Sequence, residues 1–135
     1  MLKGTLINPD IIAALALCGH GDKLLIADGN YPLASKTDGA KTVYLALSPG
    51  LPTVTQALAA IQSVCALEKA ELMEPGDGGT PEIFGEFHKM LGDIPFERTG
   101  RGEFYELCRE KNVRLAISTG EQRLFANILL TIGTA

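Results

Sequence analysis

Short runs of apolar residues alternate along the chain with segments in which apolar residues recur every three or four positions. The short runs are typical of buried strands, and the recurring spacing is typical of helices that bury one face. Strands are therefore predicted at residues 23–27, 42–47, 71–74, 113–118 and 127–131, with a short extended piece at 95–98. This alternation of helices and strands indicates an α/β fold with a mostly parallel sheet.

The residues between the strands mark helix starts. Asn8-Pro9-Asp10 places a capping side chain, a proline and an acid at the start of the first helix. Thr53 caps a second helix, Thr80-Pro81-Glu82 opens a third, and a fourth begins at Gly102 or Glu103. The apolar spacing predicts three inner faces, which consist of Ile11, Ile12, Leu15 and Cys18; of Val54, Leu58, Ile61, Val64 and Cys65; and of Ile83, Phe84, Phe87 and Leu91.

The direction of the last strand follows from the length of the link before it. A parallel crossover needs a dozen or more residues, usually including a helix. The link from Ile117 to Asn127 is too short for that. The last strand is therefore expected to run antiparallel to its partner or to pair elsewhere.

Composition narrows the class of protein. The 135 residues suggest one domain, residues 1–135, and 46% apolar against 21% charged residues exclude a disordered chain. A net charge of −4 argues against nucleic acid as a partner, because such binding depends on a basic surface. No apolar run is long enough to span a membrane, and the first residues show no signal-peptide pattern.

The number and spacing of the cysteines indicate the redox state of the cellular compartment. Cys18, Cys65 and Cys108 show no C-x-x-C spacing. An odd, scattered set in an acidic chain fits reduced thiols better than disulfides or zinc. We interpret the three as small core residues and expect a cytoplasmic protein.

The candidate chemistry is concentrated around the strand at residues 23–27. His20 stands in the Gly-His-Gly turn that enters this strand, and Asp28 stands at its carboxyl end, where open α/β sheets bind ligands. The unperturbed pKa of histidine lies close to neutrality. The residues alone allow two interpretations: an acid/base pair facing a pocket, or a turn histidine and a strand-ending aspartate that caps backbone amides.

Other positions carry weaker signals. Arg101 lies between two glycines, and its guanidinium suits hydroxyls and carboxylates. Asn127 begins an apolar strand, which is a poor place for an amide without partners. Tyr31 lies in the loop after the first strand and is placed to line a pocket, whereas His88 is expected to be a solvated surface residue. The glycine-rich residues 75–79 lack the lysine and Ser/Thr of a P-loop, which argues against phosphate binding.

Two motifs stand at opposite ends of the chain: Gly19-His20-Gly21-Asp22 with Ile26-Ala27-Asp28, and Thr119-Gly120-Glu121 with Ala126-Asn127-Ile128-Leu129-Leu130. Their residues and order resemble those of the D-ribose pyranase and L-fucose mutarotase family (RbsD/FucU). The combination of Arg101 with Phe104-Tyr105-Glu106 resembles the fucose branch of that family. The resemblance covers essentially the whole chain.

The resemblance implies a three-layer α/β/α fold and an isomerase that interconverts anomers or ring forms of a sugar such as L-fucose or D-ribose, without cofactor or metal. The residue matching His20 is the acid/base, and those matching Asp28, Arg101 and Phe125-Ala126-Asn127 bind the sugar. Family members form rings, often decamers of two stacked pentamers, with the site between neighbouring subunits. The expected partners are therefore a monosaccharide and copies of the same chain.

One position departs from the family pattern. The family usually has tyrosine where this chain has Phe125, so a hydroxyl that contacts the sugar is missing. Tyr31 and Tyr105 are alternative sources of a hydroxyl. The departure leaves open a non-catalytic monosaccharide-binding protein on the same scaffold and, as a third alternative, a scaffold protein with a vestigial pocket.

Overall fold

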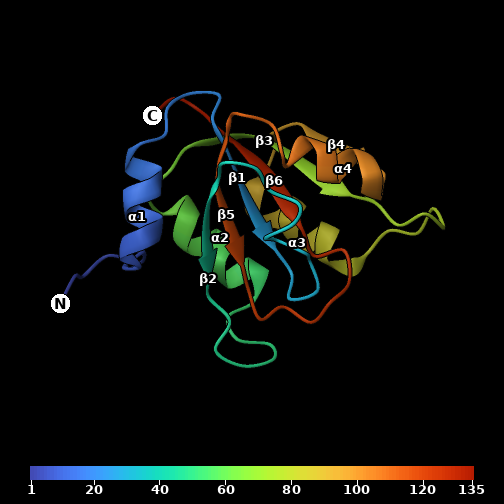
Figure 1. The fold of residues 1–135 in the computed structure, drawn as a ribbon, viewed down its shortest axis with the longest axis horizontal. Helices are drawn as coiled ribbons and strands as arrows, with labels where there is room; N and C mark the ends of the chain where they lie inside the picture. Colours follow the sequence, from blue (N-terminus) through green and yellow to red (C-terminus); the bar gives the residue numbers. More distant parts are fainter.

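A six-stranded sheet forms the centre of the computed structural model, which describes residues 1–135 (Figure 1). The strands are β1 (Lys23–Ala27), β2 (Lys41–Tyr44), β3 (Leu67–Met73), β4 (Phe96–Thr99), β5 (Val113–Ser118) and β6 (Ile128–Ile132). They lie side by side in the order β2-β5-β1-β6-β3-β4. With its helices, this sheet confirms the predicted α/β class.

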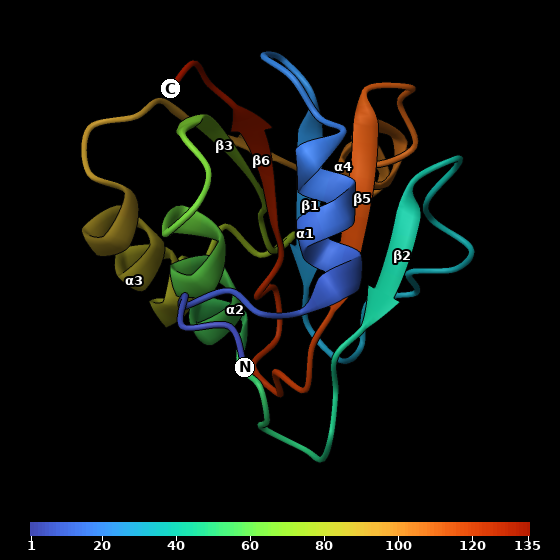
Figure 2. The same cartoon turned by 90° about the vertical axis from the view of Figure 1, so that its left-hand side faces the viewer.

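The last strand runs against both of its neighbours. β6 pairs antiparallel with β1 and β3, whereas β1 and β2 pair parallel with β5, and β3 pairs parallel with β4. Figure 2 shows the arrow of β6 pointing opposite to that of β2. The antiparallel direction predicted from the short link is confirmed. β6 also lies in the middle of the sheet and not at its edge.

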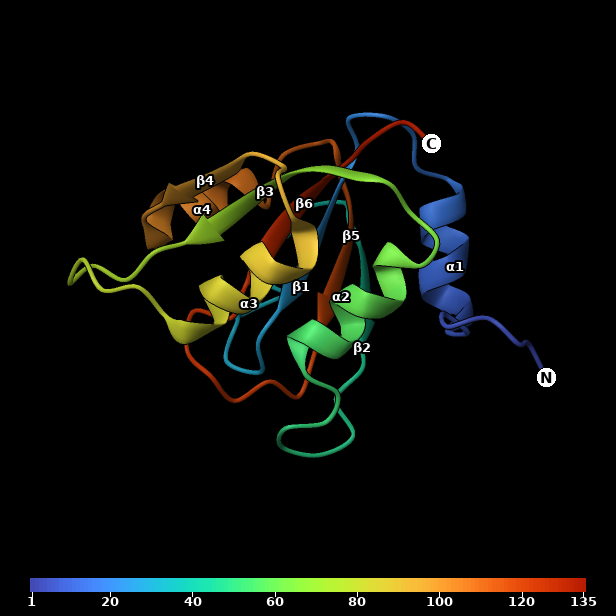
Figure 3. The ribbon, with the colours of Figure 1, turned by 180° about the vertical axis from the view of Figure 1, so that it is seen from behind.

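Helices cover both faces of the sheet. They are α1 (Pro9–Ala16), α2 (Val54–Gln62), α3 (Glu82–Leu91) and α4 (Arg101–Leu107). The first three lie on one face, and α4 lies on the other (Figures 2 and 3). This arrangement gives the three layers that the family resemblance implies. None of these helices is both long and apolar enough to cross a membrane.

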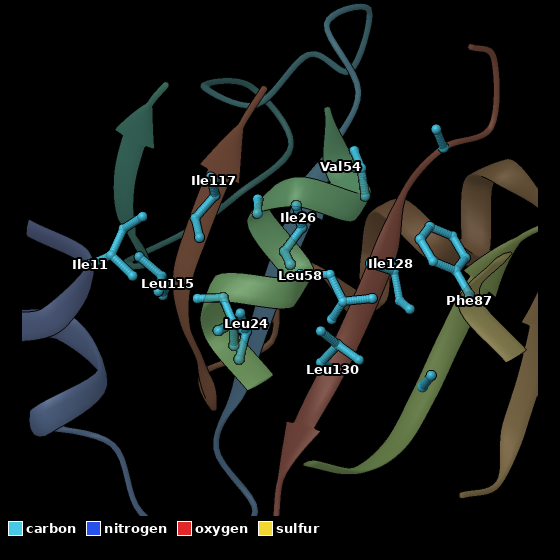
Figure 4. Packing of buried hydrophobic residues seen from close by; sticks show 14 of the residues in the cluster. Ile11, Leu24, Ile26, Val54, Leu58, Phe87, Leu115, Ile117, Ile128 and Leu130 are labelled. Atoms are coloured by element: carbon cyan, nitrogen blue, oxygen red, sulfur yellow. The ribbon is translucent and has the colours of Figure 1, made fainter. Parts of the chain in front are cut away.

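Alternate residues of the strands enter two separate cores. On β1, Leu24 and Ile26 join the core under α1, α2 and α3, whereas Leu25 and Ala27 join the core under α4. Leu58 of α2 packs over the strands in the first of these (Figure 4). That core has 21 buried residues against 10 in the other, and each large apolar side chain buried contributes about 1.5–3 kcal/mol. The three-helix layer therefore supplies most of the apolar stabilisation.

Two helix starts follow the predicted capping. The Asn8 side chain accepts a hydrogen bond from the Ile11 backbone N–H over 3.0 Å at the start of α1. Thr53 and Gln56 form a reciprocal capping box at the start of α2. Such caps satisfy backbone donors that the first turn of a helix leaves free, and each is worth about 1 kcal/mol.

Some boundaries differ from the prediction. β2 ends at Tyr44, because Leu47 already belongs to a tight turn. β3 begins at Leu67, four positions before the predicted start, because Leu67 and Lys69 still pair with β6. The prediction that Val64 faces inward from the second helix is wrong, since α2 ends at Gln62 and Val64 is 59% exposed.

Candidate active site

A small pocket opens at the edge of the sheet where β1 and β3 end and β6 begins. Its volume is about 200 Å³, and it is lined by Asp28, Asn30, Tyr31, Met73, Arg101, Tyr105, Leu124, Phe125 and Asn127. Asp28 follows β1, Met73 ends β3, and Arg101 comes shortly after β4. Because β6 is antiparallel, Asn127 reaches the same edge from the other direction. The topology thus brings together distant segments where α/β sheets usually bind ligands.

Asp28 is a buried acid at the wall of this pocket. The residue is 3% exposed, and its Oδ1 accepts a hydrogen bond from the Asn30 backbone N–H over 2.9 Å. Burial raises the pKa of Asp28, and hydrogen bonds from backbone and side-chain donors around it offset part of the rise. The carboxyl group therefore takes up a proton more readily than an exposed aspartate does, which suits a group that works on hydroxyls.

Asn127 is the buried amide that faces Asp28 from the start of β6. Its Oδ1 accepts a hydrogen bond from the Asp28 backbone N–H over 2.8 Å. That donor fixes the orientation of the amide, because the Asn127 oxygen must point toward it. The amide N–H groups are left on the side of the Asp28 carboxylate and the pocket, where they can donate to a ligand hydroxyl.

Arg101 and Phe125 form another wall. The guanidinium carbon Cζ of Arg101 lies 5.9 Å from the centroid of the Phe125 ring, within the range of a cation–π contact. Arg101 is exposed and forms no ion pair in this structure, so its donors are free for a ligand. Phe125 has a φ of 60°, a conformation that bulky residues rarely adopt. Neighbouring contacts must therefore hold this ring in place.

A partly buried network around Glu121 anchors the segment that carries this ring. Glu121 is 4% exposed and accepts hydrogen bonds from Arg123 Nε over 2.9 Å and from the Val54 backbone N–H over 3.2 Å. Arg123 also binds Glu86 on α3. Burial by itself raises the pKa of Glu121, but the hydrogen bonds from Arg123 and Val54 outweigh it, so the pKa is lowered. The network ties the segment to the start of α2 and to α3.

The whole chain, residues 1–135, matches the family described as the RbsD / FucU transport protein family. The chain belongs to this family. It is 30% identical over 133 residues to the D-ribose pyranase of Chloroflexus aggregans, with 98% of both chains covered. It is 33% identical over 133 residues to the D-ribose pyranase of Bacillus cytotoxicus, with the same coverage.

Solved structures of both branches of the RbsD/FucU family are similar to this one. Bacillus subtilis RbsD complexed with D-ribose aligns with a TM-score of 0.87 and 29% identity, over 100% of this chain and 99% of that one. The fucose mutarotase from Streptococcus pneumoniae in complex with L-fucose aligns with a TM-score of 0.84 and 28% identity, with the same coverage. The family assigned from the two motifs is confirmed, and both branches match at similar identity.

In this RbsD/FucU chain, His20 lies at the opposite end of β1 from the pocket. Its side chain is 58% exposed, and its Nε2 lies 2.9 Å from Glu68 Oε1. The five residues of β1 alone span about 13 Å, since a strand rises about 3.3 Å per residue. The interpretation of His20 and Asp28 as a pair facing one pocket is therefore wrong for a single chain. An acid/base role of His20 at a site between subunits stays a prediction.

The two tyrosines near the RbsD/FucU pocket differ in what they present to it. The Tyr31 hydroxyl is buried without a hydrogen-bond partner, and burial next to the Cys108 thiol raises the pKa of Tyr31. Tyr31 therefore contributes its ring but not its hydroxyl. Tyr105 is half-buried one turn after Arg101 on α4 and lines the pocket, so it is the tyrosine that can present a hydroxyl to a ligand.

The pocket gathers most of the residues predicted for the site, namely Asp28, Arg101, Phe125 and Asn127. Ala126 is fully buried and contributes only a backbone N–H toward Asp28. Tyr105, predicted as an alternative source of a hydroxyl, lines the pocket because residues four apart on a helix share a face and Tyr105 is four after Arg101. The prediction missed Met73, whose place in the pocket depends on the strand order. His88 is exposed on α3 and lies outside the pocket, as expected.

Proposed function

We propose that this protein is a sugar mutarotase, an isomerase that interconverts anomers or ring forms of a monosaccharide such as L-fucose or D-ribose by acid/base catalysis. The observation that carries the proposal is the pocket in which a buried carboxyl group, an amide and an unpaired guanidinium converge beside an aromatic ring. These groups match the hydroxyls and the apolar face of a sugar. Relatives named D-ribose pyranase, and structures with D-ribose and L-fucose bound, support the substrate class.

The reaction moves protons and opens and closes one bond. A base removes the proton of the anomeric hydroxyl, the bond between the anomeric carbon and the ring oxygen breaks, and an acid protonates that oxygen. The carbonyl of the open chain then turns, and the ring closes by the reverse steps. The net result is an isomer of the same sugar, and proton transfer by positioned side chains contributes about 10²- to 10⁴-fold to the rate.

Each pocket residue has a place in this scheme. His20 of a neighbouring subunit acts as the acid/base, because histidine gives and takes protons near neutral pH. Asp28 holds a sugar hydroxyl or orients the imidazole, and its raised pKa fits a carboxyl group buried among hydroxyls. Arg101 and Asn127 fix further hydroxyls, and the Phe125 ring packs against the C–H face of the sugar. The scheme uses no metal or redox group.

The same scheme requires assembly, and we infer the homodecamer of two stacked pentamers that the resemblance implies. His20 is open to solvent, and Leu17, three residues earlier, is 88% exposed. An apolar cavity of about 310 Å³ lies on the same side of the fold and is lined by Leu6, Ile12, Leu15, Ala16, Val64 and Cys65. Exposed apolar surface of this kind supports contact with further subunits. The unpaired cysteines fit a cytoplasmic location.

A second candidate is a non-catalytic monosaccharide-binding protein. The observation that favours it is Phe125, which lines the pocket but has no hydroxyl, while the Tyr31 hydroxyl is buried without a hydrogen-bond partner. Such a protein would keep the groups that hold the sugar and lack one that takes part in proton transfer.

NMR exchange measurements separate the two candidates. Saturation of one anomeric proton of D-ribose, L-fucose or D-galactose should transfer to the other anomer faster with the protein present than without it. Saturation-difference spectra on the same samples report binding. Faster exchange for at least one sugar supports the mutarotase, whereas binding without faster exchange supports the binding protein.

A further inference from the structure

A second cavity lies next to the pocket assigned above to the sugar. Its volume is about 530 Å³, against about 200 Å³ for the sugar pocket. Arg101 and Phe125 line both cavities, and the remaining lining comes from Glu74 and the glycine-rich loop after it, together with Gly100. The two cavities therefore adjoin along this pair of residues. The second cavity has room for a chemical group at least as large as the one that fits the sugar pocket.

The shared wall is built to contact a ligand from both sides. Phe125 holds a φ of 60° and is anchored through the Glu121 network, so the ring keeps a fixed place between the cavities. Strained backbone of this kind is often found at ligand contacts. The Arg101 guanidinium stands 5.9 Å from the ring centroid without a carboxylate partner. The wall thus offers an apolar face with free hydrogen-bond donors beside it. Two linked sugar rings have complementary surfaces, because each ring has an apolar C–H face and hydroxyl groups at its edge.

The charge of the second cavity indicates a neutral ligand. Glu74 is exposed, and its carboxylate forms no ion pair or hydrogen bond in this structure. It balances the single positive charge of Arg101 across the cavity. A phosphate or carboxylate on the ligand would meet Glu74, whereas hydroxyls accept from Arg101 and donate to Glu74.

We propose that the second cavity is a subsite for a neutral glycosyl substituent, so that the protein acts on reducing disaccharides as well as on free monosaccharides. The reducing ring occupies the sugar pocket, and the second ring lies beyond Arg101 and Phe125 against Glu74. The proposal rests on the mutarotase function and extends its substrate class. The chemical step is unchanged, because only the reducing ring opens and closes.

The test compares anomer exchange of each accelerated monosaccharide with that of disaccharides that carry it as the reducing ring, for example D-galactose with galactobiose, or D-glucose with lactose, melibiose and maltose. At least one disaccharide should exchange at a rate within about tenfold of the best monosaccharide, a difference of about 1.4 kcal/mol. Exchange of monosaccharides with no disaccharide accelerated would overturn the subsite and leave the mutarotase function standing. If no sugar of either kind is accelerated, both proposals fail together.

A filled-cavity variant makes the test specific. Gly76 lines the second cavity only, and a Cβ there meets nothing within 4 Å. Gly76→Phe should lower disaccharide exchange by about tenfold or more while monosaccharide exchange stays within about twofold, because the added ring occupies the place of the second sugar. Gly85→Phe is the matched control, since Gly85 lies on α3, lines neither cavity and has equally open space. Equal loss for both sugar classes in Gly76→Phe contradicts a separate subsite.

Glu74→Gln provides an independent test that does not depend on a bulky side chain. It keeps the shape of the lining and removes the charged acceptor, so the KM for the disaccharide should rise about three- to tenfold with the monosaccharide KM unchanged. An unchanged disaccharide KM would show that Glu74 does not bind the second ring and would contradict the polar contact on which the subsite is based.

Discussion

At its carboxyl end β1 runs into Asp28, an acid that is 3% exposed and held by hydrogen bonds to the protein around it. At its amino end the strand follows His20, whose side chain is 58% exposed and bound to Glu68 alone. The first group is fixed in a pocket of its own chain, and the second projects from the surface. One RbsD/FucU chain therefore has a buried, hydrogen-bonded carboxyl group at one end of β1 and an exposed histidine at the other, and the proposed mechanism assigns sugar binding to the first and acid/base chemistry to the second.

The contacts at the two ends of β1 also differ in the free energy that is lost when they break. An exposed ion pair contributes about 0–1 kcal/mol, so His20 can leave Glu68 at little cost. A buried donor that loses its acceptor costs about 1–3 kcal/mol, so the contacts of Asp28 are retained. The difference fits a site in which a mobile group from one subunit meets a rigid pocket on another. The predictions below change one end at a time.

The largest effect is expected from His20→Ala. Anomer exchange should fall by about 100-fold or more, the usual scale for loss of a general acid/base. The midpoint of thermal unfolding should stay the same, because the side chain is exposed and its pair with Glu68 is weak. Glu68→Gln is the control and should keep most of the activity. Full exchange activity in His20→Ala would rule out the role.

Mixing chains that are each altered at one end of β1 tests whether the two ends of a site come from different subunits. Assemblies formed from His20→Ala and Asp28→Asn chains should recover part of the exchange activity that each variant lacks alone. Recovery is expected because some sites then combine an intact His20 with an intact Asp28. A site contained in one chain would give no recovery at any mixing ratio.

At the pocket end, Asn127→Ala should lower the free energy of unfolding by about 1–3 kcal/mol. The reason is that the Asp28 backbone N–H loses its acceptor in a buried place. Asn127→Asp keeps an oxygen for that N–H but replaces the amide donors by a second buried carboxyl group beside Asp28, so it should lose sugar affinity and should recover stability as pH falls and the pair takes up a proton. Chemical unfolding and sugar titration on both variants separate the structural from the binding contribution of Asn127.

Phe125→Tyr should produce a smaller change, in the direction of a gain. The added hydroxyl lies in the lining of the pocket and can bond to the sugar, which is worth about 0.5–1.5 kcal/mol, or roughly a 2- to 13-fold change in affinity or turnover. Tyr31→Phe is the matched control, because it removes a hydroxyl that is buried and unpaired, and it should leave the sugar response unchanged. A destabilised Phe125→Tyr protein with an unchanged sugar response would place the ring in the core.

The smallest effect is a pH dependence of stability that has opposite signs at two carboxyl groups. Because the folded pKa of Asp28 is raised, the folded state binds the proton more tightly, and stability falls as pH rises from the unfolded pKa through the folded one. The pKa of Glu121 is lowered, so its contribution is present above the unfolded pKa and is lost as pH falls through the folded one. Unfolding free energies of Asp28→Asn and Glu121→Gln, measured against pH in the acid range, should differ from the parent protein with opposite slopes.

The local features of the fold could be predicted from the sequence because they depend on nearby residues. The caps at Asn8 and Thr53 and the direction of β6 are of this kind. The early start of β3 could not be predicted, because Leu67 is ordered by pairing with β6 and not by its own apolar pattern. Local spacing predicts an element but not the partner that stabilises it.

The site shows the same limit. The local pattern marked Asp28 and Asn127 separately, as polar residues beside apolar runs, and only the family resemblance predicted them in one site. The separation of His20 from Asp28 could not be seen, since a strand between two residues keeps them close in sequence and far apart in space. Met73 has no chemical signature of its own and joins the pocket only because β3 lies next to β6.

The central position of β6 in the sheet has a consequence for folding during translation. Until residues 128–132 have emerged, β2-β5-β1 and β3-β4 have no strand between them, and the apolar edges of β1 and β3 stand open. Pairing between segments so distant along the chain is slow, because a large loop must close first. Nascent RbsD/FucU chains should therefore remain open to protease, and prone to pairing with other chains, until residues 128–132 have left the ribosome and entered the sheet.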